Sequence, residues 1–291
     1  MSTTMQPAMT RTDWVLLTIP GIIWGASFFF IAEGLEVFPP ELITPMRITF
    51  GLLALLVFPA SRAPVPRSAL PRVALLGVLW MALPLTMFPF AEQHVSSSVT
   101  GMLNGATPFF VAGVASLIAR RLPTRKQMWG LGIGFCGVIL IAVPTAREGS
   151  NSASGVAMIF VALACYGMAL NLSVGLQRAH GALPVIVRAQ AVALALTAPF
   201  GLASLPDASF SWSAFASMVL LGVGGTGIAY YMTVTLAGKV GSTRTSVTTY
   251  IMPVVALFLG AVIRNEVVAG LSLVGCGVAL AGAFLTNRSR K

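Results

Sequence analysis

Polar and aromatic side chains stand singly inside long apolar stretches of this chain, an arrangement expected of residues that line a cavity between packed helices. Asn104 and Thr107 lie in one stretch, Tyr166 and Asn171 in another, and Tyr250 in a third. Amides and hydroxyls in such places either bond a neighbouring helix or orient a small amphipathic solute. We predict the second role for a group of substrate-binding residues: Trp24, Ser27, Trp80, Thr86, Asn104, Thr107, Tyr166, Asn171, Tyr230, Tyr231 and Tyr250.

Helix-breaking residues recur beside these side chains. Residues 80–89 read WMALPLTMFP, and residues 222–227 read GVGGTG. Proline removes a backbone hydrogen bond and glycine weakens a helix, so both segments are expected to bend or change conformation. We predict hinge or gating roles for a second group: Pro84, Pro89, Pro108, Gly224, Gly227 and Pro253.

Patterns for covalent chemistry, nucleotides and metals are missing or out of context. Residues 132–137 read GIGFCG, but a dinucleotide site needs a preceding strand and a following acid, and this segment lies in an apolar run. Residues 222–227 lack the Gly-Lys-Ser/Thr ending of a phosphate loop. The chain shows no Ser/His/Asp set and no His/Cys/Asp cluster. We therefore predict no catalytic residues, no metal and no cofactor, and a protein that is not an enzyme.

The composition identifies the elements that carry these residues. The chain has 291 residues, of which 56% are hydrophobic and only 9% are charged. Soluble domains carry roughly 25% charged residues, and a soluble fold of this size does not hide so much apolar surface. Long unbroken apolar runs favour helices, because a barrel would show short alternating strands. The chain is therefore expected to be an all-α polytopic membrane protein.

Ten stretches free of Asp, Glu, Lys and Arg predict ten transmembrane helices. A spanning helix needs about 20 mostly apolar residues, and nine of the stretches have at least 18. The exception, 48–61, becomes long enough if its helix begins near Leu42 and includes Arg47. The stretches are 14–32, 48–61, 73–91, 93–119, 127–146, 149–177, 189–206, 208–238, 245–263 and 267–287.

Basic residues fix the orientation. Fourteen of the 18 Lys and Arg residues fall on the side of the termini, and only Arg147 and Arg264 fall on the opposite side. Because basic loops stay in the cytoplasm, both termini are predicted to be cytoplasmic. The net charge of +10 then forms a collar against anionic lipid and does not indicate nucleic acid as a partner.

Two arginines lie within predicted helices, Arg47 and Arg188, each about 4–6 residues from a helix end. We expect their side chains to extend to the lipid headgroups, because an arginine so near a helix end reaches the membrane surface. The alternative is contact with a substrate carboxylate or a gating role.

Acidic residues are predicted at the outer rim. Glu33 and Glu92 come about 19 residues after cytoplasmic helix starts, or roughly 28 Å along the helix. No Asp or Glu falls near the midplane, which disfavours proton-coupled export of cationic drugs. Glu92 and His94 are interpreted as a solvated loop pair, with an outer proton site as the alternative.

The two halves of the chain repeat one another. At an offset of 141, Arg47 aligns with Arg188, and at 145 Pro108 aligns with Pro253. At 140, residues 136–138 (CGV) align with the identical residues 276–278. Five helices per half make the second half enter the membrane from the opposite face, as in inverted-repeat transporters. We predict one five-helix repeat in residues 1–148 and a second in residues 149–291.

Several short motifs in the chain resemble those of a known transporter superfamily. Residues 24–27 (WGAS), Pro40 with Arg47, and residues 265–267 (NEV) followed by Gly270 resemble the drug/metabolite transporter superfamily, in its ten-helix branch with two EamA-type repeats. That branch includes bacterial amino-acid and metabolite exporters. The chain departs from the family pattern at residues 120–121, which are two arginines where a Gly-Glu-like pair is expected, and at Asn265, where Gly is expected.

The resemblance implies a multi-pass protein of the bacterial inner membrane that exports small metabolites, most of all neutral or aromatic amino acids, by alternating access. We expect its cavity among helices three, four, eight and nine, with helices one and six closing it. Its partners would be a small-molecule substrate and membrane lipid. A multidrug or nucleotide-sugar-type carrier is the alternative within the superfamily, and an intramembrane enzyme or assembly factor is the alternative of another class.

Overall fold

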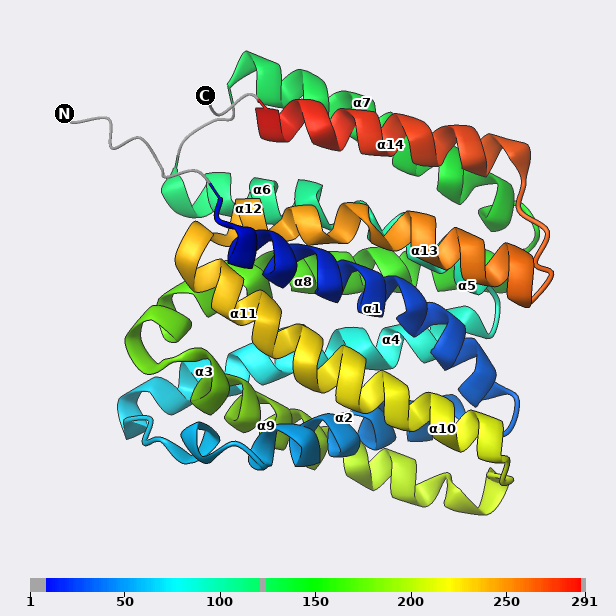
Figure 1. Ribbon diagram of the computed structural model, residues 1–291. Helices are drawn as coiled ribbons and strands as arrows, with labels where there is room; N and C mark the ends of the chain where they lie inside the picture. Colours follow the sequence, from blue (N-terminus) through cyan, green and yellow to red (C-terminus); the bar gives the residue numbers. More distant parts are fainter. Residues whose placement is uncertain (1–8, 121–123, 289–291) are drawn as a thin grey trace.

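The computed structural model describes residues 9–120 and 124–288, and these ranges contain helices and no strands (Figure 1). Eight helical segments are long and apolar enough to cross a membrane. The 17-residue helix α2 (Pro40–Leu56) and the last helix, α14 (Gly270–Arg288), complete ten crossings. The predicted all-α polytopic membrane fold is confirmed.

The first five crossings lie in residues 1–148. Two of them, the third and fourth, are divided by changes in helix type or by a break. In chain order the elements are α1 (Arg11–Leu35), α2, η1 (Pro59–Arg62), η2 (Arg67–Ala69), α3 (Leu70–Gly77), η3 (Val78–Ala82), α4 (Leu83–Glu92), α5 (Ser97–Asn104), α6 (Thr107–Ala119) and α7 (Arg125–Ala146).

The last five crossings follow the same plan, with the eighth and ninth divided. Their elements are α8 (Ser150–His180), α9 (Ala182–Ala203), η4 (Leu205–Asp207), α10 (Trp212–Leu220), η5 (Leu221–Ile228), α11 (Ala229–Val240), α12 (Ser242–Thr245), η6 (Ser246–Tyr250), α13 (Met252–Phe258), η7 (Leu259–Ile263) and α14.

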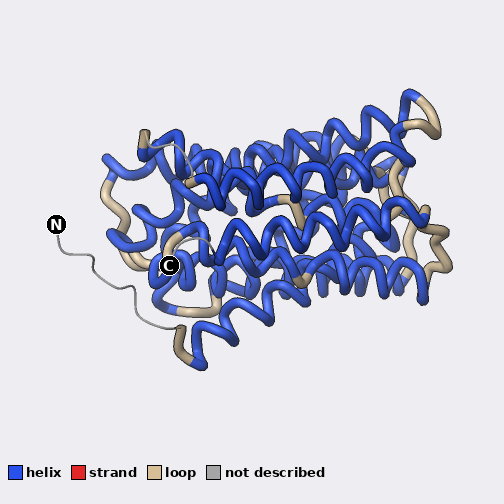
Figure 2. The backbone as a smooth tube through the Cα atoms, turned by 90° about the horizontal axis from the view of Figure 1, so that it is seen from above, coloured by secondary structure: helices blue, strands red, loops and turns tan. Residues whose placement is uncertain are grey.

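The helices form one bundle with the loops gathered at its two ends (Figures 1 and 2). Helix α1 begins and α14 ends at the same end of the bundle, called the inner end below; the opposite end is the outer end. Five crossings per half are an odd number, so the second half starts at the outer end and is inverted relative to the first. This arrangement agrees with the predicted topology.

Three segments, η3, η5 and η7, are π-helical. The first lies in the third crossing and the second in the eighth, which are equivalent positions in the two halves. A π-helical turn widens the helix and shifts its backbone hydrogen bonds, and such turns are common at functional sites. The segments rich in Gly and Pro thus coincide with irregular backbone at membrane depth, which survives only where protein or a cavity surrounds it.

Helices α7 and α14 lie side by side along one edge of the bundle (Figure 1). Their glycines face each other: a Cβ at Gly137 would collide with the backbone of Ala279, and one at Gly282 with the backbone of Gly134. The glycine pattern of residues 130–137 therefore serves close helix packing. The cavity described next lies among the other eight crossings.

Candidate functional site

A cavity lies inside the bundle, between the two halves. Both halves contribute to its wall, as expected for the crossing point of an inverted repeat. Its lining residues are Trp24, Ser27, Phe28, Ile31, Arg47, Trp80, Leu85, Phe88, Asn104, Thr107, Tyr166, Leu170, Tyr230, Thr233, Thr245, Ser246, Thr249 and Met252. Helix α2 thus joins the six crossings predicted to surround the cavity.

Aromatic rings form one wall. Tyr230 packs edge-on against Trp24, with ring centroids 5.3 Å apart, and lies tilted against Trp80, with ring centroids 5.1 Å apart. The Tyr230 hydroxyl donates to the Trp80 carbonyl at 2.9 Å, and Trp24 Nε1 donates to the Gly225 carbonyl at 2.8 Å. Because both acceptors lie in π-helical segments, the shifted backbone bonds of η3 and η5 hold these rings in place.

Hydroxyl and amide groups form the other wall. Thr107 Oγ1 donates to the carbonyl of Asn104 at 2.7 Å and lies 3.0 Å from its Oδ1. This pair stands at the break between α5 and α6, so the break places the amide in the cavity. Thr233 Oγ1 is buried and has no hydrogen-bond partner within residues 9–120 and 124–288. The wall therefore offers polar groups that a solute can use.

Arg47 provides the charge of the cavity. Its side chain is 2% exposed, and its Nε donates to Thr226 Oγ1 in η5 at 3.0 Å. Helix α2 and η5 approach closely because glycines face each other: a Cβ on Gly51 would lie 2.9 Å from the Gly222 carbonyl oxygen. The expectation that Arg47 extends to the lipid headgroups is wrong, because this contact holds its guanidinium inside the protein.

Four predicted binding residues lie away from the cavity. Thr86 donates to its own helix at Ala82, and Tyr250 donates to the Ala283 carbonyl at 2.9 Å. Asn171 joins three helices, since it donates to the Val111 carbonyl and accepts from Ser242 Oγ. Tyr231 is 36% exposed on the outside of the bundle. The other seven predicted residues all line the cavity: Trp24, Ser27, Trp80, Asn104, Thr107, Tyr166 and Tyr230.

Five of the six predicted hinge residues lie at or beside irregular backbone, and Pro89 lies inside α4. Pro84, Pro108 and Pro253 follow a π-helical segment, a helix break and a 3-10 segment, and the two glycines lie within η5. Their positions are Pro84 and Pro89 in α4, Pro108 at the start of α6, Gly224 and Gly227 in η5, and Pro253 in α13. Their hinge role remains a prediction.

Sequence reasoning missed a row of hydroxyls on the ninth crossing. Thr245, Ser246 and Thr249 line the cavity from α12 and η6. The run 245–249 reads TSVTT, and this density of hydroxyls in an apolar stretch is a signal that could have found them. Tyr250 directly follows Thr249, but its side chain points away from the cavity because it lies one residue further around the helix.

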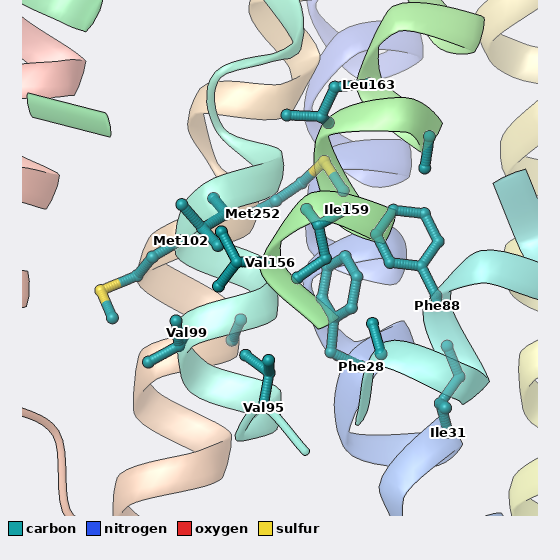
Figure 3. Close-up of a cluster of buried hydrophobic side chains, with 14 of the residues drawn as sticks. Phe28, Ile31, Phe88, Val95, Val99, Met102, Val156, Ile159, Leu163 and Met252 are labelled. Atoms are coloured by element: carbon teal, nitrogen blue, oxygen red, sulfur yellow. The ribbon is translucent and has the colours of Figure 1, made fainter. Parts of the chain in front are cut away.

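An apolar cluster separates the cavity from the outer end. Figure 3 shows Phe28 and Phe88 facing each other beside Ile31, with Val95 before α5 and Val99 within it nearby. The Phe28 and Phe88 rings are 5.5 Å apart in an edge-to-face arrangement. Such an apolar cluster opposes the passage of a polar solute in this conformation.

Beyond the cluster, an ionic network joins the two halves. Arg264 pairs with Glu33 and Glu36 at the end of α1 and lies 3.8 Å from Glu266 Oε1. Glu266 in turn accepts from the backbone N–H groups of Ser97 and Ser98 at 3.1 and 2.8 Å, which caps the start of α5. Burial would raise the pKa of Glu266, but hydrogen bonds donated by these serines outweigh burial and lower it.

Glu92 differs from its expected solvated position. Both carboxyl oxygens are buried and have no hydrogen-bond partner in the part of the chain that the structure describes. Glu92 lies one turn outward from Phe88, and it borders a second, outer hollow together with Glu36 and Asp207. His94 next to it is exposed.

Within the described ranges no group of three or more His, Cys, Asp or Glu residues is arranged to hold a metal ion. Cys165 and Cys276 are buried and Cys136 is exposed, all as free thiols. For recognition of a solute, the cavity lining offers its shape, hydrogen-bonding groups and one positive charge.

Known proteins resemble this chain over its whole length. The profile of the EamA-like transporter family matches residues 14–143 and again 153–288. The "Uncharacterized inner membrane transporter YedA" of Escherichia coli K12 is 28% identical, over 91% of this chain and 87% of that protein. A "Probable amino-acid metabolite efflux pump" of Salmonella typhimurium is 24% identical, over 95% of each. One solved crystal structure superposes with a TM-score of 0.65 at 19% identity, over 95% of this chain and 98% of that one, and so shares the fold.

These matches agree with what the bundle shows. Each profile match covers five crossings, and the fifth crossing ends and the sixth begins within residues 144–152, between the two matches. The apolar helices and the inner-membrane relative make the chain a multi-pass protein of the inner membrane. The chain belongs to the EamA-like transporter family of the drug/metabolite transporter superfamily, and it is a membrane transporter.

Proposed function

We propose that this transporter exports amino acids or similar small amphipathic metabolites, and that the central cavity holds the solute. The cavity between the two inverted halves is the observation that carries this proposal, because it combines aromatic rings, hydroxyls, one amide and one cation. Its lining of aromatic rings around hydroxyl and amide groups suits a small amphipathic solute. The name of the Salmonella relative, a probable amino-acid metabolite efflux pump, supports the same substrate class and direction.

The mechanism that fits this architecture is alternating access. The apolar cluster around Phe28 and Phe88 and the network around Arg264 close the outer end. The network joins Arg264 of the second half to Glu33 and Glu36 of the first, and the cluster also contains Ile159 and Met252 of the second half, so relative rocking of the halves would open both closures. The π-helical turns η3 and η5 lie where such a motion must be absorbed.

Counterflow in proteoliposomes tests the proposal. Vesicles holding the full chain are loaded with one unlabelled amino acid at a time, and uptake of a labelled one is followed with and without a pH gradient. We expect saturable exchange that neutral and aromatic amino acids compete. Dependence on the gradient would identify proton coupling, and its absence would identify facilitated diffusion.

A pair of tryptophan variants ties the transport to the cavity. Thr249→Trp fills the cavity, whereas Val254→Trp adds the same indole at a residue that is 60% exposed on the bundle surface. We expect the first to abolish exchange and the second to retain it. No exchange of any amino acid by folded wild-type protein would contradict the proposed substrate class, and equal exchange by both variants would contradict the proposed site.

A further inference from the structure

The guanidinium of Arg47 is placed where a protein rarely leaves a charge. Arg47 is the eighth of the 17 residues of α2, near the middle of the crossing, and is 2% exposed. Arginine stays protonated at any pH that a protein meets. A buried ion is costly unless a counter-ion and hydrogen bonds compensate for lost water.

The protein compensates this charge only in part. Nε donates to Thr226 Oγ1, and the described residues supply no other hydrogen-bond acceptor and no carboxylate within ion-pair distance. Arginine has five N–H donors in a planar fork. Four of them, on the two terminal nitrogens, therefore remain for whatever enters the cavity that Arg47 lines.

The rest of the cavity wall offers no negative charge. Arg47 is the one lining residue that is ionised, and the others carry hydroxyl, amide, indole, phenol or apolar groups. Ser27 lies nearby, since a Cβ on Gly225 would be 3.0 Å from Ser27 Oγ and 3.6 Å from Arg47 Nη2, but the Ser27 hydroxyl already donates to the Ile23 carbonyl. The empty cavity is thus electrostatically incomplete, and an anionic group of the solute completes it.

The nearest internal alternative is Glu92, which is also buried and without a hydrogen-bond partner among the described residues. Glu92 does not line the cavity and lies a helical turn outward, beyond Phe88. The two side chains form no ion pair in this structure. An external anion is therefore the occupant that the geometry favours.

The arrangement fits a carboxylate better than a phosphate. A single guanidinium binds a carboxylate through two parallel N–H···O bonds and balances its one charge. A phosphate monoester carries up to two charges, and this cavity holds no second cation. The aromatic wall formed by Trp24, Trp80 and Tyr230 then faces the rest of the solute.

We propose that Arg47 is the anion-binding residue of the cavity and that the transported solute must carry a carboxylate, which the terminal nitrogens of Arg47 receive. This inference rests on the proposed function, since it names the group by which that cavity recognises its solute. Amino acids satisfy the requirement. Amines and amino-acid amides of the same size do not.

Thermal unfolding of the purified full-length protein in detergent tests this without transport. The probes are matched pairs at neutral pH: phenylalanine with phenylalaninamide, leucine with leucinamide, and glycerol phosphate as the phosphate probe. We expect the acids to raise the unfolding temperature and the amides and glycerol phosphate to leave it unchanged. In Arg47→Gln the acid concentration for half the effect should rise about 10- to 100-fold, as for the loss of a hydrogen-bonded charge.

Three further variants keep the test decisive. Arg188→Gln removes the repeat-related arginine, which does not line the cavity, and should respond as the wild type does. Arg47→Lys should respond between wild type and Arg47→Gln, because it keeps the charge and loses the fork. If Arg47→Gln does not fold, Arg47→Lys and the acid–amide comparison on wild type still test the carboxylate requirement. Glu92→Gln should keep the preference for acids over amides. Loss of that preference in this variant would identify Glu92 as the counter-ion of Arg47.

Equal shifts from acid and amide, no shift from any acid, or an unchanged acid response in Arg47→Gln would overturn the inference. Failure of the proposed function has a different signature. Counterflow would be absent although acids still stabilise the protein through Arg47. Transport of amines without any acid response would instead leave a transporter and remove the carboxylate requirement.

Discussion

Arg47 and Arg188 occupy aligned positions of the two repeats, yet they live in different surroundings. Arg47 is buried in the cavity and bonds Thr226 across the interface between the halves. Arg188 is half-buried, and its Nη1 donates to the Pro184 carbonyl in its own helix at 3.0 Å. The two repeats therefore share the backbone position and the residue type, but the contacts of the two arginine side chains differ. One arginine became part of the cavity and the other a local helix contact.

A second pair of aligned positions shows the same divergence. Arg120 and Asn265 both adopt left-handed backbone conformations, with φ of 49° and 54°. Asn is among the residues that tolerate this region, which accounts for Asn where the family pattern has Gly. Asn265 leads into Glu266, which caps α5, whereas its counterpart in the first half is followed by an arginine at 121, outside the described residues.

The largest expected effect comes from neutralising the two arginines in turn. Arg47→Gln should lower amino-acid exchange at subsaturating concentration about 10- to 100-fold, since a charged hydrogen bond contributes about 1.5–3 kcal/mol. Arg188→Gln should stay within about twofold of wild type, because its bond lies on the helix surface. Initial exchange rates measure both. Equal losses of exchange rate in the two variants would contradict the proposed difference between Arg47 and Arg188.

The close approach of α2 to η5 should have the next largest effect. In Gly222→Ala the new Cβ would lie 2.7 Å from the Arg47 carbonyl oxygen, so the helices must separate. We expect a loss of about 1–3 kcal/mol of stability, as for other overpacked contacts. Gly113→Ala is the control, because a Cβ there meets nothing within 4 Å. Thermal unfolding midpoints compare the two, and equal midpoints would refute tight packing as the reason for Arg47's depth.

Removing the partner of Arg47 should have a smaller effect. Thr226→Val keeps the shape and deletes the hydroxyl that accepts from Nε, a loss of about 1 kcal/mol or roughly fivefold in apparent affinity. Thr197→Val deletes a buried hydroxyl that bonds only its own helix at Ala193. The concentration of amino acid for half-maximal exchange is the readout. A shift in the Thr197 variant as large as that in the Thr226 variant would show a general packing effect.

The smallest effect concerns the outer network and pH. Because hydrogen bonds lower the pKa of Glu266 below its ordinary value of 4.5, its contribution is complete above that value and is lost as the pH falls through the lowered pKa. The unfolding temperature of wild type should therefore converge on that of Glu266→Gln in acid and exceed it at pH 7. Glu148→Gln, at an exposed loop residue, should track wild type. A gap between wild type and Glu266→Gln that is constant with pH would contradict the capping role.

The sequence predicted the framework and part of the site, and the missing part has a clear cause. Apolar runs and charge placement predict ten crossings and their direction, because both reflect the lipid environment directly. Counting along a helix gives depth but not the direction of a side chain. Asn104 and Tyr250 are both predicted to bind the solute, and only Asn104 faces the cavity.

Arg47 escaped prediction for a related reason. Its depth was predicted from a helix that begins near Leu42 and continues to about residue 61, whereas α2 runs from Pro40 to Leu56 and places Arg47 near the middle. The contact that buries it comes from η5, about 180 residues later, and depends on facing glycines. A pattern within one helix cannot show which other helix will pack against it, so this information exists only in the folded structure.

The most direct test of the account is a structure of the protein with a bromine-labelled amino acid such as 4-bromophenylalanine. We predict bromine density inside the cavity beside the rings of Trp24 and Tyr230, with the carboxylate in hydrogen-bond reach of Arg47. Density beside Arg188, or in the outer hollow lined by Glu36, Glu92 and Asp207, with the cavity left empty, would contradict it.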